Sequence, residues 1–516
     1  MSRRGVLALL ALGATLGATV PASATTPLGT QQRVSVTGAD GDAALDAFSP
    51  SVAYNPAADQ YLVAWSADTG AGDDEIFARL VDGGGVPLGA QFRVSDMGPD
   101  GDPDFDVQVP AVAYNGRHGE YMIVWYGDDD AGPLVDDEFE IFAQRLSAAG
   151  AQLGVNDRRI SDMGPNGDAD FAARNPAIAY NATSDEYLVV WNGDDGSGPL
   201  VDNEREVFSQ RLSATGAQLG VNDRRISDMG PTGDASFAAE VPAVAHNPVA
   251  NQYMVAWVGD DDTGTLVEGE DEIFVQRLGA NGAEEGPNDR RVSAQGPDGN
   301  QSFGVNLPSL AYNPAHDEYL VAWEGDDDTG GKVSGGEEIF VQRLAATGAE
   351  VGADDQRISR MGPDGDTGFR ANTPRLAVGA GGSEYLVALD GTDDAPGLLT
   401  GGFEVFAQRL DPDGVEIGGD DVRVSTMGVD GDPLSDGLAA SVAYGARANE
   451  YQIAWEGDTS VPPLVNDKSE IYARRFGAGT ALANAVCKVL PPVPPPTRSG
   501  TRSPASRTPR TPPGRR

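Results

Sequence analysis

The amino-acid sequence predicts an all-β protein, a seven-bladed β-propeller with four antiparallel strands in each blade. The first observation is that four short motifs each occur seven times along the 516 residues. The second is that every motif is rich in Val, Ile, Tyr, Phe or Trp and bounded by Gly, Asn, Asp or Pro, as strands are. No segment keeps an apolar period of 3.6 residues, so we expect almost no helix. Four strands in each of seven repeats is typical of a propeller.

The motifs follow one another in a fixed order, and we name the strands a to d. Strand a is the Tyr-Asn motif, centred on Tyr54, Tyr114, Tyr180, His246, Tyr312, Val378 and Tyr444. Strand b is the Tyr-Leu-Val-Ala-Trp motif, ending at Trp65, Trp125, Trp191, Trp257, Trp323, Leu389 and Trp455. Strand c is the Glu-Ile-Phe motif, starting at Glu75, Glu140, Glu206, Glu272, Glu338, Glu404 and Glu470. Strand d is the Arg-Val/Ile-Ser motif, at Arg33, Arg93, Arg159, Arg225, Arg291, Arg357 and Arg423. The first spacing of strand d is 60 residues and the other five are 66, and the alanine-rich strand a suits the crowded position beside a central channel.

The order of the motifs also predicts how the ring closes. The chain begins with a strand d at Arg33, and its last repeat ends with strand c at Glu470. The N-terminal strand must therefore complete the last blade, which removes the open edges of a linear array.

The repeats resemble those of secreted bacterial β-propeller proteins with the pattern VAYNP…EYLVVW…EIFAQRL. The resemblance covers roughly residues 31–480. It implies the propeller fold and export, and it brings no catalytic or ligand residue with it.

The two ends of the chain differ from the repeats. Residues 1–24 are predicted to be a signal peptide. Arg3 and Arg4 precede an apolar run, and Ala22-Ser23-Ala24 is the expected cleavage site. An ordinary secretory signal and a twin-arginine signal both fit, and either places the protein outside the cytoplasm, secreted or in the cell envelope. We expect the propeller over residues 25–487 and a disordered Pro/Arg-rich tail over 488–516. Cys487 is the only cysteine, so no internal disulfide is expected.

The charge excludes several partners. The chain has 36 Lys and Arg against 79 Asp and Glu, and nine of the basic residues lie in the two ends, which leaves a net charge of −52 on residues 25–487. Such a body repels nucleic acid and anionic lipid. No segment after the signal is apolar enough to span a membrane, and we expect a monomer.

The acidic residues gather in the d–a and b–c loops, which an antiparallel blade places on one face, here called the top face. The d–a loops carry Asp-Gly-Asp or a relative of it, and the b–c loops carry runs such as Gly127-Asp128-Asp129-Asp130. One interpretation is turn chemistry, because Gly supplies a positive φ and Asp accepts hydrogen bonds from its own backbone. The other is Ca²⁺, which takes six to eight oxygen ligands. The candidate calcium ligands are Asp40, Asp42, Asp100, Asp102, Asp104, Asp168, Asp364, Asp366, Asp430 and Asp432.

Residues that recur in every blade are expected to build the blade. This applies to the strand-c Glu, to Arg33 and Arg79 with their equivalents, and to the Trp and Tyr positions, although the Arg set would also suit an anion site. His118, His246 and His316 do not recur, so no catalysis is assigned to them.

Two function classes follow from the sequence. The first is a secreted, non-catalytic binding module with a protein or polysaccharide ligand on its acidic face, because the top loops look interchangeable and no His, Cys or Ser cluster interrupts the repeats. The alternative is a carbohydrate-active hydrolase or lyase that uses two top-face carboxylates, which glycoside hydrolysis requires. No catalytic residue and no cofactor other than Ca²⁺ is expected.

Overall fold

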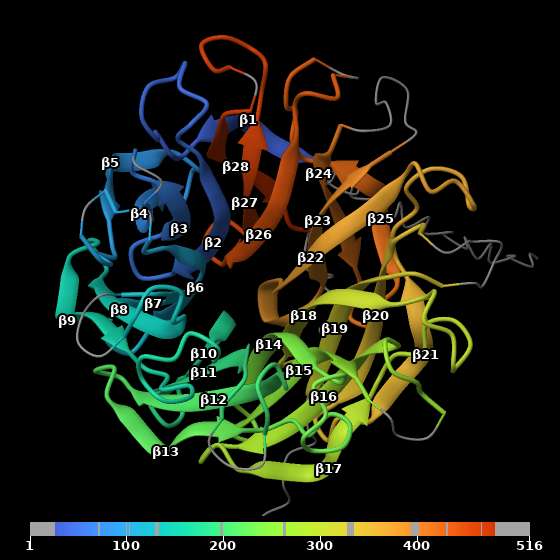
Figure 1. The fold of residues 1–516 in the computed structure, drawn as a ribbon. Helices are drawn as coiled ribbons and strands as arrows, with labels where there is room; N and C mark the ends of the chain where they lie inside the picture. Colours follow the sequence, from blue (N-terminus) through green and yellow to red (C-terminus); the bar gives the residue numbers. More distant parts are fainter. Residues whose placement is uncertain are drawn as a thin grey trace, which may run out of the picture. The chain divides into compact units, whose positions relative to one another are not determined.

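A computed structural model describes residues 26–70, 73–99, 101–102, 104–129, 134–196, 200–261, 265–327, 335–393, 402–429, 432–465 and 467–479. Within these residues the chain forms seven four-stranded antiparallel sheets arranged in a ring, a seven-bladed β-propeller (Figure 1). The predicted signal peptide, the Pro/Arg-rich tail and Cys487 lie outside the described residues. In the described part, the one helical segment is the short 3-10 helix η2 (Ala380–Gly382), and no helix is long and apolar enough to cross a membrane.

All four predicted strand types are confirmed in all seven blades. Strand a is β2 (Ala47–Asn55), β6 (Val107–Asn115), β10 (Ala173–Asn181), β14 (Ala239–Asn247), β18 (Val305–Asn313), β22 (Arg370–Val378) and β26 (Gly437–Gly445). Strand b is β3 (Gln60–Asp68), β7 (Glu120–Gly127), β11 (Glu186–Gly193), β15 (Gln252–Asp260), β19 (Glu318–Gly325), β23 (Tyr385–Thr392) and β27 (Glu450–Asp458). Strand c is β4 (Asp74–Asp82), β8 (Glu140–Ser147), β12 (Glu206–Ser213), β16 (Asp271–Gly279), β20 (Glu338–Ala345), β24 (Glu404–Leu410) and β28 (Ser469–Gly477). Strand d is β5 (Pro87–Arg93), β9 (Gln152–Arg159), β13 (Gln218–Arg225), β17 (Glu284–Arg291), β21 (Glu350–Arg357), β25 (Glu416–Arg423) and β1 (Pro27–Arg33).

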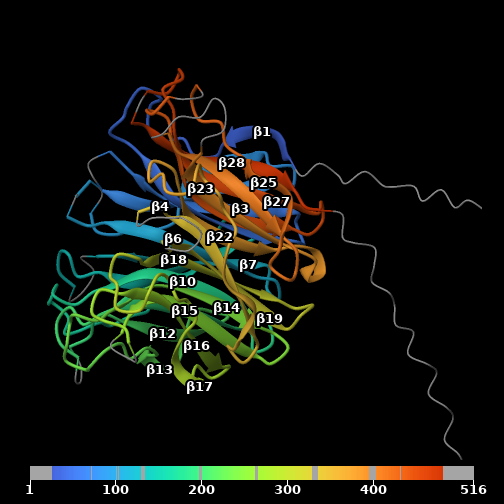
Figure 2. The same cartoon turned by 90° about the vertical axis from the view of Figure 1, so that its right-hand side faces the viewer.

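The ring closes as the order of the motifs predicted. Strand β1 pairs antiparallel with β28, so blade 7 consists of β26, β27, β28 and the N-terminal strand. The inner strands of neighbouring blades contact one another all the way round, including β2 with β26 across the seam. In the side view of Figure 2 the strands run across the molecule and the long connections extend to the left.

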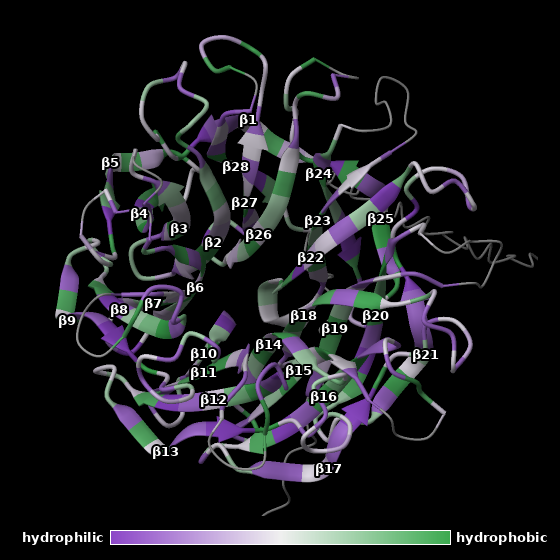
Figure 3. Ribbon diagram, in the orientation of Figure 1, coloured by the Kyte–Doolittle hydropathy of each residue, from purple (hydrophilic) through white to green (hydrophobic). Residues whose placement is uncertain are grey.

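The hydrophobic core lies between the blades. Trp191 of blade 3 is fully buried and packs in one cluster with Val124 and Ile160 of blade 2. At the seam, Trp65 of blade 1 shares a cluster with Ile471 of blade 7. Leu389 takes the tryptophan position in blade 6 and is equally buried. The outer strands are polar in comparison, as β17 shows in Figure 3.

A carboxylate latch ties strand c to strand d in every blade. In blade 1 the buried Glu75 forms an ion pair with Arg93, accepts the Ser95 hydroxyl and accepts the backbone N–H of Met97 at 3.0 Å. The Ser95 hydroxyl in turn accepts the N–H of Ile76 at 2.7 Å. The same Glu–Arg and Glu–Ser contacts occur in the other six blades. The structural interpretation of the recurring Glu and of the strand-d Arg is therefore confirmed. Arg79 is not part of the latch: it donates to the carbonyls of Val34 and Gly89, and its position in strand c is occupied by Gln144 in blade 2.

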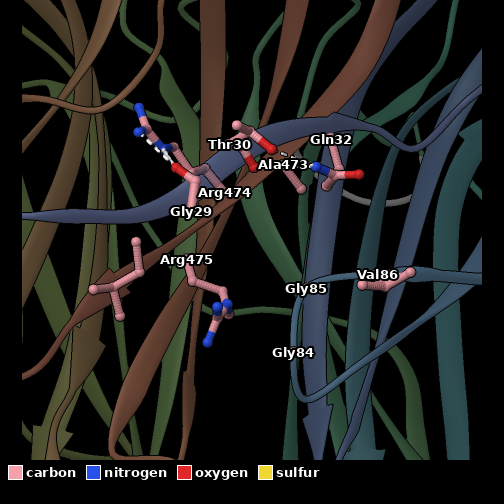
Figure 4. Close-up of a pocket in the computed structure, with 10 residues that line it drawn as sticks. Gly29, Thr30, Gln32, Gly84, Gly85, Val86, Ala473, Arg474 and Arg475 are labelled. Carbon is pink, nitrogen blue, oxygen red and sulfur yellow. Dashed lines mark hydrogen bonds between the residues drawn. The ribbon is translucent and has the colours of Figure 1, made fainter.

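The closing seam differs from the other interfaces between blades at one buried position, Gln452. A small pocket of about 200 Å³ opens there between β1, β28 and the turn Gly83–Gly85 (Figure 4). Arg474 donates to the carbonyl of Gly29 at 2.7 and 3.0 Å, while Arg475 lies beside Gly85. The buried Gln452 stands where the other blades have Leu or Met, and no described protein group hydrogen-bonds to its side chain.

Candidate functional site

The structure gives local roles to most of the predicted calcium ligands. Asp40 and Asp364 accept from the strand-d arginines Arg33 and Arg357 at 2.6 and 2.7 Å. Five others accept the N–H two residues further on, at 3.0–3.3 Å; they are Asp42, Asp102, Asp168, Asp366 and Asp432. Asp104 is exposed, and Asp100 and Asp430 lie outside the described residues.

The glycine of the d–a loop also has a structural partner. Gly167 has a φ of 88°, and its N–H donates to Glu138 of the preceding b–c loop at 2.8 Å. The same bond joins Gly233 to Glu204 and Gly299 to Glu270. Within the described residues no three His, Cys, Asp or Glu side chains converge as metal ligands would. The loop geometry thus fits turn chemistry, and calcium binding stays a prediction.

The top face is not uniform around the ring, unlike the sequence-based expectation of interchangeable loops. Three positions at the inner top rim differ from blade to blade. Directly after the strand-b tryptophan position stand Ser66, Tyr126, Asn192, Val258, Glu324, Asp390 and Glu456. Their cross-strand partners in strand a are Phe48, Gln108, Arg174, Glu240, Asn306, Asn372 and Leu438. Directly before the latch glutamate stand Asp74, Phe139, Arg205, Asp271, Glu337, Phe403 and Ser469.

A β-bulge fixes the backbone beside these positions. The bulged residue of strand a has a φ of 47–52° in every blade; these residues are Ser49, Val109, Asn175, Val241, Leu307, Thr373 and Ala439. Positive φ is costly for Val and Thr, and such bulges are common at the rims of barrels and next to active sites. The strain recurs in all seven blades, so it belongs to the framework, while the side chains beside it vary.

The first asymmetric region is a pocket of about 410 Å³ on the top of blade 3, bordered by Glu240 of blade 4 and here called the arginine pocket. Its charged lining residues are Arg174, Arg205, Glu240, Asp170 and Asp194. Arg205 forms an ion pair with Glu240 of the next blade. Asp194 accepts the N–H groups of Ala172 and Asn203, both at 2.9 Å, and burial raises its pKa.

Arg174 is held by aromatic rings instead of carboxylates. Its guanidinium carbon lies 4.2 Å from the ring centre of Phe139 and 5.7 Å from that of Tyr126. Tyr126 is fixed in turn, because its hydroxyl donates to Gln108 at 2.7 Å. No described carboxylate lies within ion-pair distance of Arg174, although the protein is strongly acidic.

The second asymmetric region is the carboxylate arc, which consists of Glu324, Asp390 and Glu456 on blades 5, 6 and 7. Each carboxylate accepts the backbone N–H of the bulged residue in the next blade; these residues are Thr373, Ala439 and Ser49. Asp390 is 2% exposed, and Glu324 and Glu456 are partly exposed.

The arc carboxylates hold protons more tightly than ordinary ones. Burial raises the pKa of Glu324 to about 7 and, as the largest cause, raises that of Glu456 as well. Burial also raises the pKa of Asp390 to about 7, and the like charges of Glu324 and Glu456 act in the same direction. Carboxylates with such pKa values are candidates for general acid catalysis.

Arg375 adds a cation beside the arc. It stands on the innermost strand β22, where the other blades have Ser or Ala, and its charge favours ionisation of Asp390. Its Nη1 donates to the carbonyl of Pro374 at 2.9 Å, and burial lowers its pKa. Among the described residues it forms no ion pair, so its guanidinium keeps donors for another group.

The histidines do not join either region. His246 lies beside Tyr253 and 3.4 Å from Asn251, and burial lowers its pKa. His118 contacts Asp185 at 2.9 Å, in the short turns of the opposite face. The sequence reasoning missed the arginine pocket and the carboxylate arc, although an alignment of the seven repeats shows which positions break the pattern.

No family model matches the chain, and no curated protein does either. Among solved structures, the chain is similar to an ulvan lyase of polysaccharide lyase family 25, with 9% identity, a TM-score of 0.49, and coverage of 87% of this chain and 97% of the other. An N-acetylgalactosamine deacetylase from F. plautii has 15% identity, a TM-score of 0.33, and coverage of 62% and 87%. A prolyl endopeptidase has 12% identity, a TM-score of 0.41, and coverage of 83% and 50%. At these identities and scores the likeness carries no conclusion about activity.

Proposed function

We propose that the protein is an exported carbohydrate-active propeller, a hydrolase or lyase, that binds a polysaccharide on its top face. The observation that carries the proposal is the carboxylate arc, three acids on consecutive blades at positions where the other blades have Ser, Tyr, Asn or Val. An enzyme needs one asymmetric group of residues, and the arc with Arg375 is such a group.

The chemistry of the arc suits cleavage of a glycosidic bond. Glu324 is partly exposed and has a pKa of about 7, so near neutral pH much of it carries a proton for the leaving oxygen. A neighbouring carboxylate of the arc would act as base or nucleophile, as glycoside hydrolysis requires. The Arg375 guanidinium would stabilise negative charge that develops on a bound sugar.

The test is product formation by the purified mature chain on a panel of neutral and acidic polysaccharides, with detection of reducing ends and unsaturated sugars. We expect release from at least one substrate and a loss of about a hundredfold or more in Glu324→Gln. Asp421→Asn is the matched control, because Asp421 is also a carboxylate with a pKa of about 7 but lies on the outer strand β25. Activity that survives in Glu324→Gln, Asp390→Asn and Glu456→Gln would refute the assignment.

A non-catalytic binding module is the second candidate. It is favoured by the bonds from the arc carboxylates to backbone N–H groups, because a carboxylate that holds the next blade can be purely structural. In that case the protein would bind a polysaccharide of the panel, and no cleavage product would be detected.

A further inference from the structure

We infer that the arginine pocket binds the anionic group of an acidic polysaccharide, a carboxylate or a sulfate carried on a sugar ring. The inference rests on the proposed function in that it names the class of polysaccharide, but it concerns a different part of the rim from the carboxylate arc. The shared chemistry is a planar or tetrahedral anion flanked by hydroxyl groups.

The first argument is the position of the two arginines. Arg174 and Arg205 occupy rim positions where no other blade has a basic residue, and both side chains are exposed. Neither belongs to the latch or to any other recurring contact of the fold. The repeat pattern therefore gives no structural reason for two arginines on the top of blade 3.

The second argument is that Arg174 is already oriented. Arg174 donates to the Tyr126 hydroxyl, and the rings of Phe139 and Tyr126, 4.2 and 5.7 Å from its guanidinium carbon, fix the plane of the guanidinium while its other N–H groups can still donate to a ligand. A guanidinium in a fixed plane matches the two oxygens of a carboxylate or sulfate at low cost in side-chain entropy.

The third argument comes from the carboxylates of the pocket. Glu240 is neutralised by Arg205, and Asp194 is satisfied by two backbone N–H groups. Within this pocket, Arg174 is thus the cation whose charge no described carboxylate balances directly. Glu240 and the exposed Asp170 offer acceptors to sugar hydroxyls at the edge of the same pocket.

The size of the pocket suits a sugar unit of a longer chain. About 410 Å³ falls within the range of small-molecule sites. Because the pocket lies on the top rim and has polar walls, it can hold one residue of a polymer that continues along the face.

The experiment is calorimetric titration with four probes: oligogalacturonate, its methyl ester, dextran sulfate and unmodified dextran. We expect oligogalacturonate or dextran sulfate to bind, and the matching uncharged polymer to bind at least tenfold more weakly. The two acidic probes separate a carboxylate ligand from a sulfate ligand. Equal affinity for the charged and uncharged forms, or binding of none of the four probes, would overturn the inference.

Variants locate the binding. Arg174→Gln and Arg205→Gln should each weaken binding of the acidic probe about tenfold, because each removes a charge-assisted hydrogen bond. Arg447→Gln is the matched control, since Arg447 is 65% exposed in a short a–b turn, on the face opposite the pocket. Thermal unfolding of each variant checks that the fold is intact. Affinities in both pocket variants equal to that of the control would contradict the inference.

Binding is also measured in Glu324→Gln. Binding that depends on Arg174 in a protein that releases no product would support the inference and refute the proposed activity. Cleavage of neutral polysaccharides that Arg174→Gln does not change, together with no preference for acidic probes in binding, would support the proposed activity and refute the inference.

Discussion

Single residues in this protein divide into those that repeat and those that do not. The latch glutamates repeat, and each is buried with an arginine, a serine hydroxyl and a backbone N–H as partners. A buried carboxylate without such partners would be strongly destabilising, which explains why the set recurs as a unit. Repetition was enough to predict that Glu and Arg build the blade; the serine of the Arg-Val/Ile-Ser motif repeats as well, but only the structure shows that its hydroxyl bonds to the Glu.

Two buried glutamines break the pattern at a cost in stability. Gln295 stands where most blades have Met, Gln452 stands where the others have Leu or Met, and no described protein group bonds to either amide. We expect Gln295→Met and Gln452→Leu each to raise the free energy of unfolding by about 1–3 kcal/mol, because a buried polar group without a partner costs that much. Urea unfolding measures the change.

The control for this prediction is Gln276→Leu. Gln276 is equally buried, but its side chain donates to the carbonyl of Arg277 at 2.9 Å and accepts the N–H of Asp289. Its replacement should lower stability. Destabilisation by Gln295→Met and Gln452→Leu as well would show that these amides are satisfied in solution.

At the scale of the elements, strand β1 carries the closure of the ring. It pairs with β28, and Arg33 and Ser35 complete the latch of Glu470. Removal of residues 25–38 exposes β28 as an edge and leaves Glu470 buried with few of its partners. We expect aggregation, or a large loss of thermal stability, in size-exclusion chromatography and thermal unfolding.

The matched truncation removes residues 488–516, which lie outside the described residues, and should leave both measurements unchanged. A monomer of unaltered stability after the N-terminal deletion would contradict the closed ring.

At the scale of the whole molecule, half-buried carboxylates lie at the contacts between neighbouring blades. Asp157, Asp289 and Asp355 on the outer strands each accept a backbone N–H from the preceding blade, at 2.8–3.1 Å. Burial raises the pKa of each to about 7. In an unfolded chain these groups titrate near 4, so the folded state binds their protons more tightly.

This linkage fixes the sign of the pH dependence. Stabilisation from a raised pKa is complete below the unfolded value near 4 and is lost as the pH rises through about 7. We therefore expect a lower melting temperature at pH 8.5 than at pH 5.5. The triple variant Asp157→Asn, Asp289→Asn, Asp355→Asn keeps the acceptors and should flatten the profile. A melting temperature that rises across this interval would contradict the assignment.

Thermal unfolding tests the calcium prediction in this chain, whose net charge is −43. A cation that binds only the folded state stabilises it by about 2.7 kcal/mol at a hundredfold excess over Kd, and the effect saturates. Melting is compared in EDTA, in about 1 mM Ca²⁺ and in NaCl of matched ionic strength. If calcium binds, only Ca²⁺ should give a saturable rise, and Asp100→Ala with Asp102→Ala should reduce it. Equal melting curves in all three solutions would show that the acidic loops are turns without a calcium site.

The sequence by itself determined the architecture, because the strands and their order follow from short motifs that repeat along the chain. Strand type follows from residue preference, blade number from the count of motifs, and closure from a strand d before the first blade and none after the last. Only the tertiary structure decided which of the non-repeating residues come together. Arg174 and Glu240 are 66 residues apart and line one pocket, and Glu324, Asp390 and Glu456 meet along one rim, because the ring places equivalent positions of successive blades side by side.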